Sequence, residues 1–326
     1  MKKYRAFALF SGGLDSILST KYMLKLGYDI LPIFFKTVFF GPEKAIEIAE
    51  SNGLKLIVKD ITEIYLKMLL NPKYGYGKNM NPCIDCHGLM FQEAGKLMPD
   101  YQVDFLISGE VLGQRPKSQR SDALNSVANL SQVRELIIRP LSQKLLPDTK
   151  PIKAGWVEKD DLLDIQGRSR ARQMHLAKEL GVKNYLTPGG GCLLTDANFT
   201  QRLQDLLKYK MFTLKNIKFL KYGRHFRLSE NTKLIVGRNK QDNDEIANLI
   251  TDEITLLTKG VPGPLAVLRS HHKLQDIEIT RAAGILLRYN NKANPIHPVL
   301  IKQHHKVIDE KKVKKFSDKE TKEFII

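Results

Sequence analysis

The feature that most constrains this chain is the stretch SGGLDS at residues 11–16, which lies between two apolar segments. Residues 4–10 (YRAFALF) suit a buried strand, and the apolar spacing of residues 14–26 predicts a helix that ends at Gly27. A glycine pair at such a junction lets backbone N–H groups approach a phosphate, and the helix N-terminus adds partial positive charge. The stretch therefore predicts a phosphate-binding loop, although a plain turn capped by Ser11 or Asp15 is the structural alternative.

The alternation of strands and helices continues after this loop. Residues 30–35 and 54–58 suit further strands, and residues 43–52 between them suit a helix. This order is typical of an α/β fold with an open, mostly parallel sheet and helices on both faces. Ligands bind such sheets beyond the carboxyl ends of the strands, where Phe35 is expected to face either an adenine ring or the core.

Charge and hydropathy limit the classes of partner. The chain has 326 residues and a net charge of +17, from 52 basic and 35 acidic side chains. Its length suits two or three domains, and such an excess of positive charge favours a polyanion, with nucleic acid the first expectation. The sequence contains neither a run of membrane-spanning length nor a recognisable export signal, so we expect a cytoplasmic protein without membrane association.

The three cysteines indicate reactive thiols or metal ligands rather than a disulfide framework. Cys83 and Cys86 begin a predicted helix after the Gly- and Asn-rich loop at residues 71–81, and the helix field is expected to lower both thiol pKa values. Cys192 follows three glycines, which predicts an accessible thiol on a flexible loop.

Several arginines suit contacts with a nucleic-acid backbone. Arg115 follows a predicted strand that ends in Ser108-Gly109-Glu110, and Arg168, Arg170 and Arg172 adjoin a predicted basic helix at residues 169–180. Ordinary surface ion pairs and a solvated helix face are the alternatives.

The loop SGGLDS resembles the PP-loop of the ATP pyrophosphatase superfamily, whose members cleave ATP to AMP and pyrophosphate. The resemblance implies a fold of the adenine nucleotide α-hydrolase type and a requirement for ATP and Mg²⁺. It also implies a catalytic role for Asp15, which would position the loop or the metal. The residues that would bind ATP are Ser11, Gly12, Gly13, Asp15, Ser16, Phe35 and Gly109.

The cysteine positions resemble those of tRNA-thiolating PP-loop enzymes, in which one cysteine follows an Asn-Pro pair and another lies far downstream. The resemblance implies two possible chemistries. In one, Cys86 and Cys192 act catalytically through a persulfide. In the other, which we favour, Cys83, Cys86 and Cys192 hold a [4Fe–4S] cluster. A structural zinc site on the same three residues is the alternative to both.

The end of the chain resembles a second family. The run KLIVGRNKQDNDEI at residues 233–246 and PGPLAVL at residues 262–268 are similar to the RNA-binding domain of NFACT proteins. This resemblance implies a smaller, basic α+β domain with Arg238 among its RNA-binding residues. We therefore expect domains at 1–150, 151–210 and 211–326, and we interpret residues 311–315 as a solvated basic tail.

Together these patterns predict an ATP-dependent tRNA thiouridine synthase. It would adenylate a uridine carbonyl oxygen and replace it with sulfur, using tRNA and a sulfur donor such as sulfide, a cysteine desulfurase or a carrier protein. Two alternatives stay open at this point. One is a PP-loop ligase that forms amides on a nucleoside or nucleotide and carries structural zinc; the other is an ATP-gated RNA-binding protein without turnover.

Overall fold

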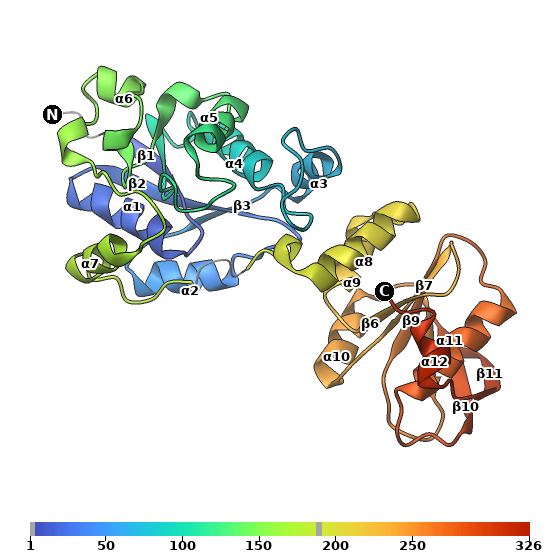
Figure 1. Cartoon of the computed structure of the whole chain (residues 1–326). Coiled ribbons are helices and arrows are strands. Elements are labelled where there is room, and N and C mark those ends of the chain that lie inside the picture. The colour runs from blue at the N-terminus through green and yellow to red at the C-terminus, as the bar shows by residue number, and fades with distance from the viewer. Residues whose placement is uncertain (1–3, 187–190) are drawn as a thin grey trace. The chain divides into compact units, whose positions relative to one another are not determined.

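The computed structural model describes residues 4–186 and 191–326, which divide into two compact units, Met1–Thr195 and Asp196–Ile326. Residues 151–195 of the predicted middle segment belong to the first unit, and residues 196–210 to the second. Each unit contains its own sheet (Figure 1).

The N-terminal unit is built on a five-stranded parallel sheet with strand order β3-β2-β1-β4-β5. The strands are β1 (Arg5–Leu9), β2 (Asp29–Lys36), β3 (Ile57–Asp60), β4 (Phe105–Ser108) and β5 (Ile137–Ile138). The α-helices are α1 (Leu14–Lys25), α2 (Glu43–Ser51), α3 (Thr62–Leu70), α4 (Cys83–Leu97), α5 (Ser121–Leu130), α6 (Lys150–Lys153) and α7 (Ala171–Glu179). Short 3₁₀ helices are η1 (Arg134–Leu136), η2 (Gln143–Leu145), η3 (Lys159–Asp161) and η4 (Leu193–Thr195).

The period of two in β1 places its side chains on opposite faces of this sheet. Ala6 and Ala8 pack with Met23 of α1 on one face. Phe7 contacts Tyr101, beyond the end of α4, and α4 itself packs against β1 and β4. The parallel α/β sheet predicted from the sequence is therefore confirmed.

One strand boundary differs from the expectation. The third strand begins at Ile57 rather than Leu54. Leu54 is buried with Ile17 of α1 and Ile48 of α2, so its apolar character serves helix packing before the strand begins.

The C-terminal unit contains a six-stranded antiparallel sheet with strand order β11-β10-β8-β9-β7-β6. The strands are β6 (Arg224–Arg227), β7 (Thr232–Val236), β8 (Ile254–Thr258), β9 (Ala266–Ser270), β10 (Ile296–Gln303) and β11 (Lys306–Lys314). The helices are α8 (Ala197–Lys208), α9 (Leu214–Phe219), α10 (Lys240–Leu249), α11 (Asp276–Arg288) and α12 (Asp318–Lys322).

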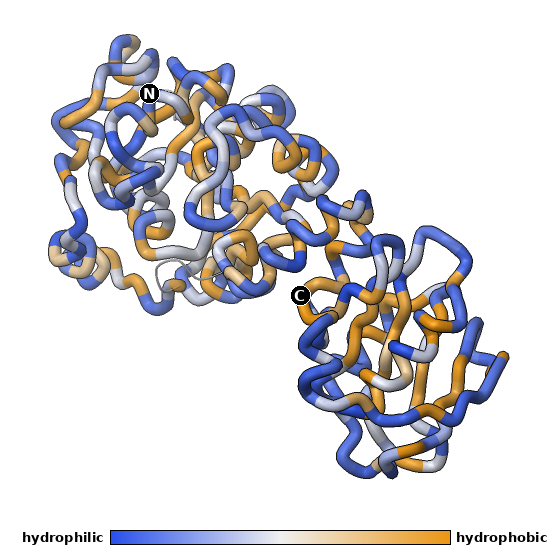
Figure 2. Tube along the Cα trace, turned by 45° about the vertical axis from the view of Figure 1, so that its right-hand side comes forward, coloured by the Kyte–Doolittle hydropathy of each residue, from blue (hydrophilic) through white to orange (hydrophobic). Residues whose placement is uncertain are grey.

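Helices cover both faces of this second sheet. Ala282 and Leu286 of α11 pack against Leu234 and other residues on one face. Phe219 of α9 and Ile246 of α10 pack against the opposite face. The hydropathy colouring shows largely hydrophobic strands and hydrophilic outer loops in this unit (Figure 2). The smaller C-terminal domain predicted from the sequence is confirmed as an antiparallel sheet with helices.

The interpretation of residues 311–315 as a solvated tail is wrong. Residues 311–314 belong to β11, which pairs along its length with β10, and Val313 is buried in the core. Lys315 donates through its side chain to the backbone carbonyl of Asn290 at 2.9 Å. The lysines of this segment suggested a solvated tail, but its backbone pairs with β10 and Val313 anchors it in the core.

Candidate functional site

The loop between β1 and α1 has a fixed shape held by its own side chains. Gly12 adopts φ +76°, a conformation that favours glycine. The Ser16 hydroxyl donates to the Gly13 carbonyl at 2.8 Å and accepts from the Ser11 N–H at 3.3 Å. The Gly12 carbonyl accepts from the N–H of Leu186 at 2.8 Å, so a distant segment also holds the loop.

This loop lies at the carboxyl edge of the sheet, where the sequence predicts a ligand. Helix α1 begins directly after it at Leu14, so the first amides of the helix offer donors and partial positive charge to an anion. Strand β4 pairs with β1, and Gly109, which follows β4, lies against the backbone of Asp15 and Ser16 at the start of α1. A Cβ on Gly109 would lie 2.4 Å from the carbonyl carbon of Asp15, so only glycine permits this approach.

The structure therefore brings together six of the residues predicted to bind ATP. They are Ser11, Gly12, Gly13, Asp15, Ser16 and Gly109. The seventh, Phe35, is the penultimate residue of the neighbouring strand β2 and is only 3% exposed. Its burial agrees with the core-packing alternative.

Asp15 has the environment of a ligand for a cation. Its Oδ2 accepts from Gln114 Nε2 at 2.5 Å and lies 3.6 Å from Arg170 Nη2. Its Oδ1 is buried and, within the described residues, has no hydrogen-bond partner. Burial raises the pKa of Asp15, although Gln114 and the arginines Arg170 and Arg115 oppose this effect. A free, buried carboxylate oxygen beside a phosphate-binding loop fits the Mg²⁺ that accompanies ATP.

Glu110, which follows Gly109, belongs to a buried network. Its Oε1 lies 2.8 Å from His87 Nδ1, and its Oε2 accepts from Arg139 Nε at 2.9 Å. Burial alone would raise the pKa of Glu110, but Arg139 and His87 outweigh it and lower that pKa to about 2. The ion pair between Glu110 and Arg139 had one signal in the sequence: Arg139 is a charged residue directly after the apolar strand β5.

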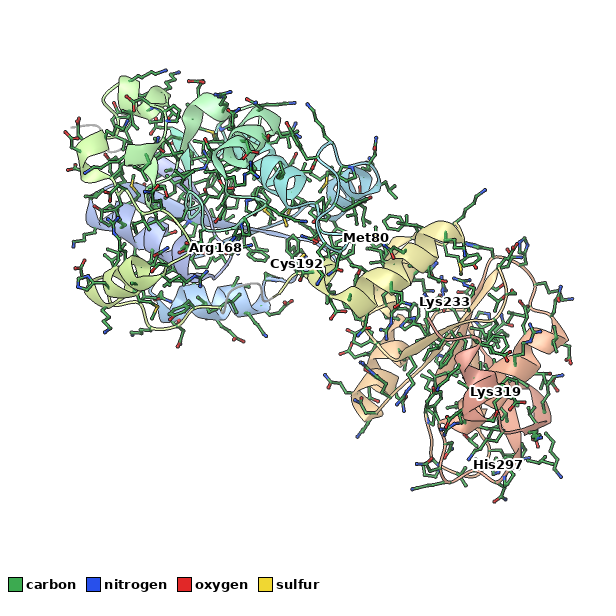
Figure 3. All side chains as sticks on the ribbon, in the orientation of Figure 1. Met80, Arg168, Cys192, Lys233, His297 and Lys319 are labelled. Atoms are coloured by element: carbon green, nitrogen blue, oxygen red, sulfur yellow. The ribbon has the colours of Figure 1, made fainter. Side chains whose placement is uncertain are left out.

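The three cysteine side chains lie near one another in the N-terminal unit. Cys83 is the first residue of α4, and Cys86 lies in its first turn. Cys192, labelled in Figure 3, directly precedes η4. Cys86 interacts electrostatically with both other thiols and forms a hydrogen bond with the hydroxyl of Tyr65. The structure therefore brings the three predicted cysteines close enough to interact electrostatically.

The expectation that the helix field lowers the thiol pKa is wrong for Cys86. Burial, reinforced by the neighbouring Cys192, raises the pKa of Cys86 far above its ordinary value. Burial also raises the pKa of Cys192 to about 11, and this residue is partly buried rather than fully accessible. Of the glycines that precede it, Gly189 and Gly190 lie outside the described residues. Desolvation of a thiolate outweighs the partial charge of one helix terminus.

Two hydrogen-bonded segments hold the cysteines in place. The Asp85 carboxylate accepts from the N–H groups of Lys73 and Tyr74 at 2.7 and 3.0 Å, which fixes the preceding loop to α4. Near Cys192, the N–H of Leu193 donates to the carbonyl of Phe39, beyond the end of β2, at 3.2 Å. Tyr65 packs on Phe39 with ring centroids 5.7 Å apart. The sequence interpretation did not single out Asp85 or Tyr65, because their roles depend on contacts across the fold.

The thiols do not form a closed metal site. In the parts of the chain that the structure describes, no three His, Cys, Asp or Glu side chains are grouped to hold a metal ion. The three thiolates are donor atoms that zinc and iron–sulfur clusters accept.

The predicted RNA-binding arginines occupy different environments. Arg115 and Arg168 are exposed, and Arg172 pairs with Asp164 at 2.6 Å on the surface. Arg170 instead approaches Asp15. Arg238 lies in the C-terminal unit and makes a two-pronged ion pair with Asp242, at 2.5 and 3.0 Å.

None of the helices in the described residues has the length and hydrophobicity needed to span a membrane.

Comparison with known proteins gives a separate match for each unit. The family described as thiamine biosynthesis protein (ThiI) matches residues 2–144, and the family described as NFACT protein RNA binding domain matches residues 223–325. A search of curated protein sequences finds no match.

Solved structures resemble the chain at low sequence identity. A predicted subunit of a tRNA methyltransferase from Methanocaldococcus jannaschii is 21% identical, over 54% of this chain and 76% of that one, with a TM-score of 0.34. A 4-thiouridine synthetase in complex with RNA and ATP is 21% identical, over 55% of this chain and 52% of that one, with a TM-score of 0.34. The U34-tRNA thiolase NcsA from Methanococcus maripaludis, with its [4Fe–4S] cluster, is 14% identical, over 68% and 72%, with a TM-score of 0.33.

The loop geometry and the two family matches lead to one assignment. The chain combines an N-terminal PP-loop ATP pyrophosphatase domain of the ThiI type with a C-terminal NFACT-type RNA-binding domain.

Proposed function

We propose that this protein is an ATP-dependent tRNA thiouridine synthase. The observation that carries the proposal is the position of three interacting cysteines in the same unit as the PP-loop. The Cys192 segment contacts Phe39 beyond the carboxyl end of β2, and the PP-loop follows the carboxyl end of the adjacent strand β1. An ATP site and a sulfur centre at one edge of one sheet support a reaction that uses both.

The proposed reaction has two displacements. A uridine carbonyl oxygen attacks the α-phosphate of ATP, and pyrophosphate leaves. A sulfur nucleophile delivered at the cysteines then attacks the activated ring carbon, and AMP leaves with the former carbonyl oxygen. The PP-loop amides and α1 would hold the phosphates, and Asp15 would hold Mg²⁺, so the first step relies on positioning and charge neutralisation.

In this proposal the sulfur is held at the three cysteines by one of two groups, a persulfide or an iron–sulfur cluster. Thiols that interact with one another suit a persulfide that one cysteine carries and another releases by forming a disulfide. A [4Fe–4S] cluster, when bound to the three thiolates, would supply an iron that lacks a protein ligand. The C-terminal domain would contribute tRNA binding, in agreement with its family match and the net charge of +17.

The test is an anaerobic reaction of purified protein with unmodified tRNA, ATP and Mg²⁺, followed by digestion and mass spectrometry of the nucleosides. Two sulfur donors are used in parallel: sulfide, which suits the iron–sulfur chemistry, and a cysteine desulfurase with cysteine and a thiol reductant, which supplies the sulfane sulfur that a persulfide requires and reduces the disulfide left after transfer. We expect a thionucleoside that requires ATP and is absent with Asp15→Asn. AMP production without any thionucleoside would instead support an amide-forming ligase, and RNA binding without AMP production would support a non-catalytic RNA-binding protein.

A further inference from the structure

We infer that Arg170, which directly precedes α7, and Gln173 of α7 complete the nucleotide site, although both lie beyond the segment matched by the ThiI family. Arg170 binds the phosphates of ATP, and Gln173 positions Asp15. This inference rests on the proposed use of ATP and assigns to Arg170 a role other than the RNA contact expected from the sequence.

Helix α7 packs directly on the helix that follows the PP-loop. Its buried residues Leu176 and Ala177 share a core cluster with Leu14 and Leu18 of α1. Just beyond α7, the N–H of Leu186 donates to the Gly12 carbonyl at 2.8 Å. The position of α7 relative to the loop is thus set both by side-chain packing and by a backbone hydrogen bond.

Gln173 acts on Asp15 both through Gln114 and directly, since its side chain also opposes the rise that burial causes in the pKa of the Asp15 carboxyl. Gln173 is fully buried, and its Nε2 donates to Gln114 Oε1 at 2.7 Å. Gln114 Nε2 then donates to Asp15 Oδ2 at 2.5 Å. A carboxylate only accepts, so Gln114 must turn its NH₂ group toward Asp15 and its oxygen toward Gln173. Gln173 therefore fixes the orientation of the group that holds Asp15.

Arg170 has the geometry of a phosphate ligand rather than of a purely structural ion pair. Its guanidinium lies 3.6 Å from Asp15 Oδ2, too far for a hydrogen bond, and its side chain is 27% exposed. Donors of the guanidinium consequently remain available to a second anion at the PP-loop. Guanidinium groups bind phosphate oxygens through paired hydrogen bonds, which suits this position.

Arg172 provides an internal contrast. It lies two residues further along the same segment and pairs with Asp164 at 2.6 Å, where both side chains are more than half exposed. The two arginines have the same chemistry but different neighbours, so one is directed to the nucleotide loop and the other to the surface.

The first experiment compares Arg170→Gln with Arg172→Gln. The dissociation constant for ATP with Mg²⁺ is measured by calorimetry without RNA or sulfide, and that for tRNA by fluorescence anisotropy. We expect Arg170→Gln to weaken ATP binding about tenfold to a hundredfold, the scale of a lost charged hydrogen bond, and to leave tRNA affinity within about twofold. Arg172→Gln should leave ATP binding unchanged. Loss of tRNA affinity with normal ATP binding by Arg170→Gln would overturn the inference and return Arg170 to the RNA surface.

The second experiment tests the positioning role with Gln173→Met, which keeps the volume and removes the hydrogen bond. We expect a lower kcat for AMP formation and a higher Mg²⁺ concentration at half-maximal rate, with the KM for ATP within about twofold. A lower melting temperature with an unchanged Mg²⁺ requirement would reduce Gln173 to a structural residue. If this variant does not fold, Gln173→Asn, which keeps the amide but shortens the side chain that reaches Gln114, is measured in the same way. An unchanged Mg²⁺ requirement in that variant contradicts the positioning role.

Failure of the inference and failure of the proposed function are distinguishable. A wild-type protein that makes no thionucleoside defeats the proposed function but leaves the ATP affinities measurable. Equal ATP affinities of wild type and Arg170→Gln defeat the inference even if thiouridine forms.

Discussion

The side-chain amide of Asn79 donates a hydrogen bond of 2.6 Å to the backbone carbonyl of Thr195, 116 residues away in sequence. This contact joins the loop before Cys83 to the segment that carries Cys192. It therefore helps to hold the third cysteine near the other two, and its removal should affect sulfur transfer more than ATP cleavage.

We predict that Asn79→Ala lowers the rate of thionucleoside formation about fivefold, which corresponds to roughly 1 kcal/mol for one hydrogen bond. AMP formation from ATP should change by less than twofold. Both products are quantified in the same reaction, and Asn129→Ala, an exposed change on α5, is the control. Equal losses of both products would show that the contact supports the unit as a whole.

Gly109→Ala should disturb the PP-loop. The new Cβ would lie 2.4 Å from the carbonyl carbon of Asp15, and this contact is with backbone, so β4 or the start of α1 must move. We expect about tenfold weaker ATP binding and a loss of about 1–3 kcal/mol of unfolding free energy, typical of overpacking. Gly53→Ala is the control, because its φ of +72° adds strain while its Cβ meets no atom within 4 Å. ATP binding that stays normal in Gly109→Ala would contradict the proposed contact between β4 and the loop.

Substitution of single cysteines should separate the two sulfur chemistries. Cys192→Ser should abolish thionucleoside formation in either chemistry and leave AMP formation within about twofold, because Cys192 contributes no atom to the PP-loop hydrogen bonds. Cys83→Ser decides between the two. A [4Fe–4S] cluster requires all three thiolates, whereas a persulfide relay requires only Cys86 and Cys192.

The measurement combines mass spectrometry of the nucleosides, with sulfide and with a cysteine desulfurase plus cysteine as separate sulfur donors, with visible absorption of anaerobically purified protein. Inactive Cys83→Ser without cluster absorption supports the iron–sulfur chemistry, and active Cys83→Ser supports the persulfide. A fully active Cys192→Ser would exclude both.

The buried pair Glu110–Arg139 should make stability depend on pH. The folded-state pKa of Glu110 is lowered to about 2 from 4.5, so the folded state favours the ionised carboxylate. Its contribution is present above pH 4.5 and is lost as the pH falls toward 2. The shift corresponds to roughly 3 kcal/mol of unfolding free energy.

We predict that the unfolding free energy of the N-terminal unit falls more steeply between pH 5 and pH 3 in the wild type than in Glu110→Gln. At pH 7, Glu110→Gln should be less stable by about 3–5 kcal/mol, because Arg139 loses its buried partner. The fluorescence of Trp156, the only tryptophan, reports this unit during urea unfolding. Glu135→Gln, at an exposed ion pair with Arg134, should retain the wild-type pH dependence.

Removal of residues 196–326 should weaken tRNA binding and flatten its dependence on salt, because fewer phosphate contacts release fewer counterions. The cut belongs at residue 196, since Leu203 and Leu206 of α8 are buried within the C-terminal unit. Binding is measured at several salt concentrations, with AMP formation in the absence of RNA as the control for an intact N-terminal unit. Unchanged affinity and salt dependence would exclude an RNA-binding role for the C-terminal unit in this protein.

Local sequence patterns determined the architecture and the place of the site. Alternating apolar strands and helices specified the parallel sheet, and SGGLDS between β1 and α1 specified the phosphate-binding loop. These features follow from neighbouring residues, because strand period, helix spacing and glycine at a turn act over a few positions. The association of the three cysteines was expected from the resemblance of their positions to those of tRNA-thiolating PP-loop enzymes.

The tertiary structure alone decided what the charged and thiol groups do. Burial, reinforced by Cys192, reversed the expected pKa shift of Cys86, and pairing with β10 placed a lysine-rich segment in strand β11. Arg170 and Arg172 are equivalent in the sequence, yet one faces Asp15 and the other Asp164. Desolvation and charge pairing depend on which distant residues meet, and in a folded chain those partners come from packing rather than from sequence neighbours.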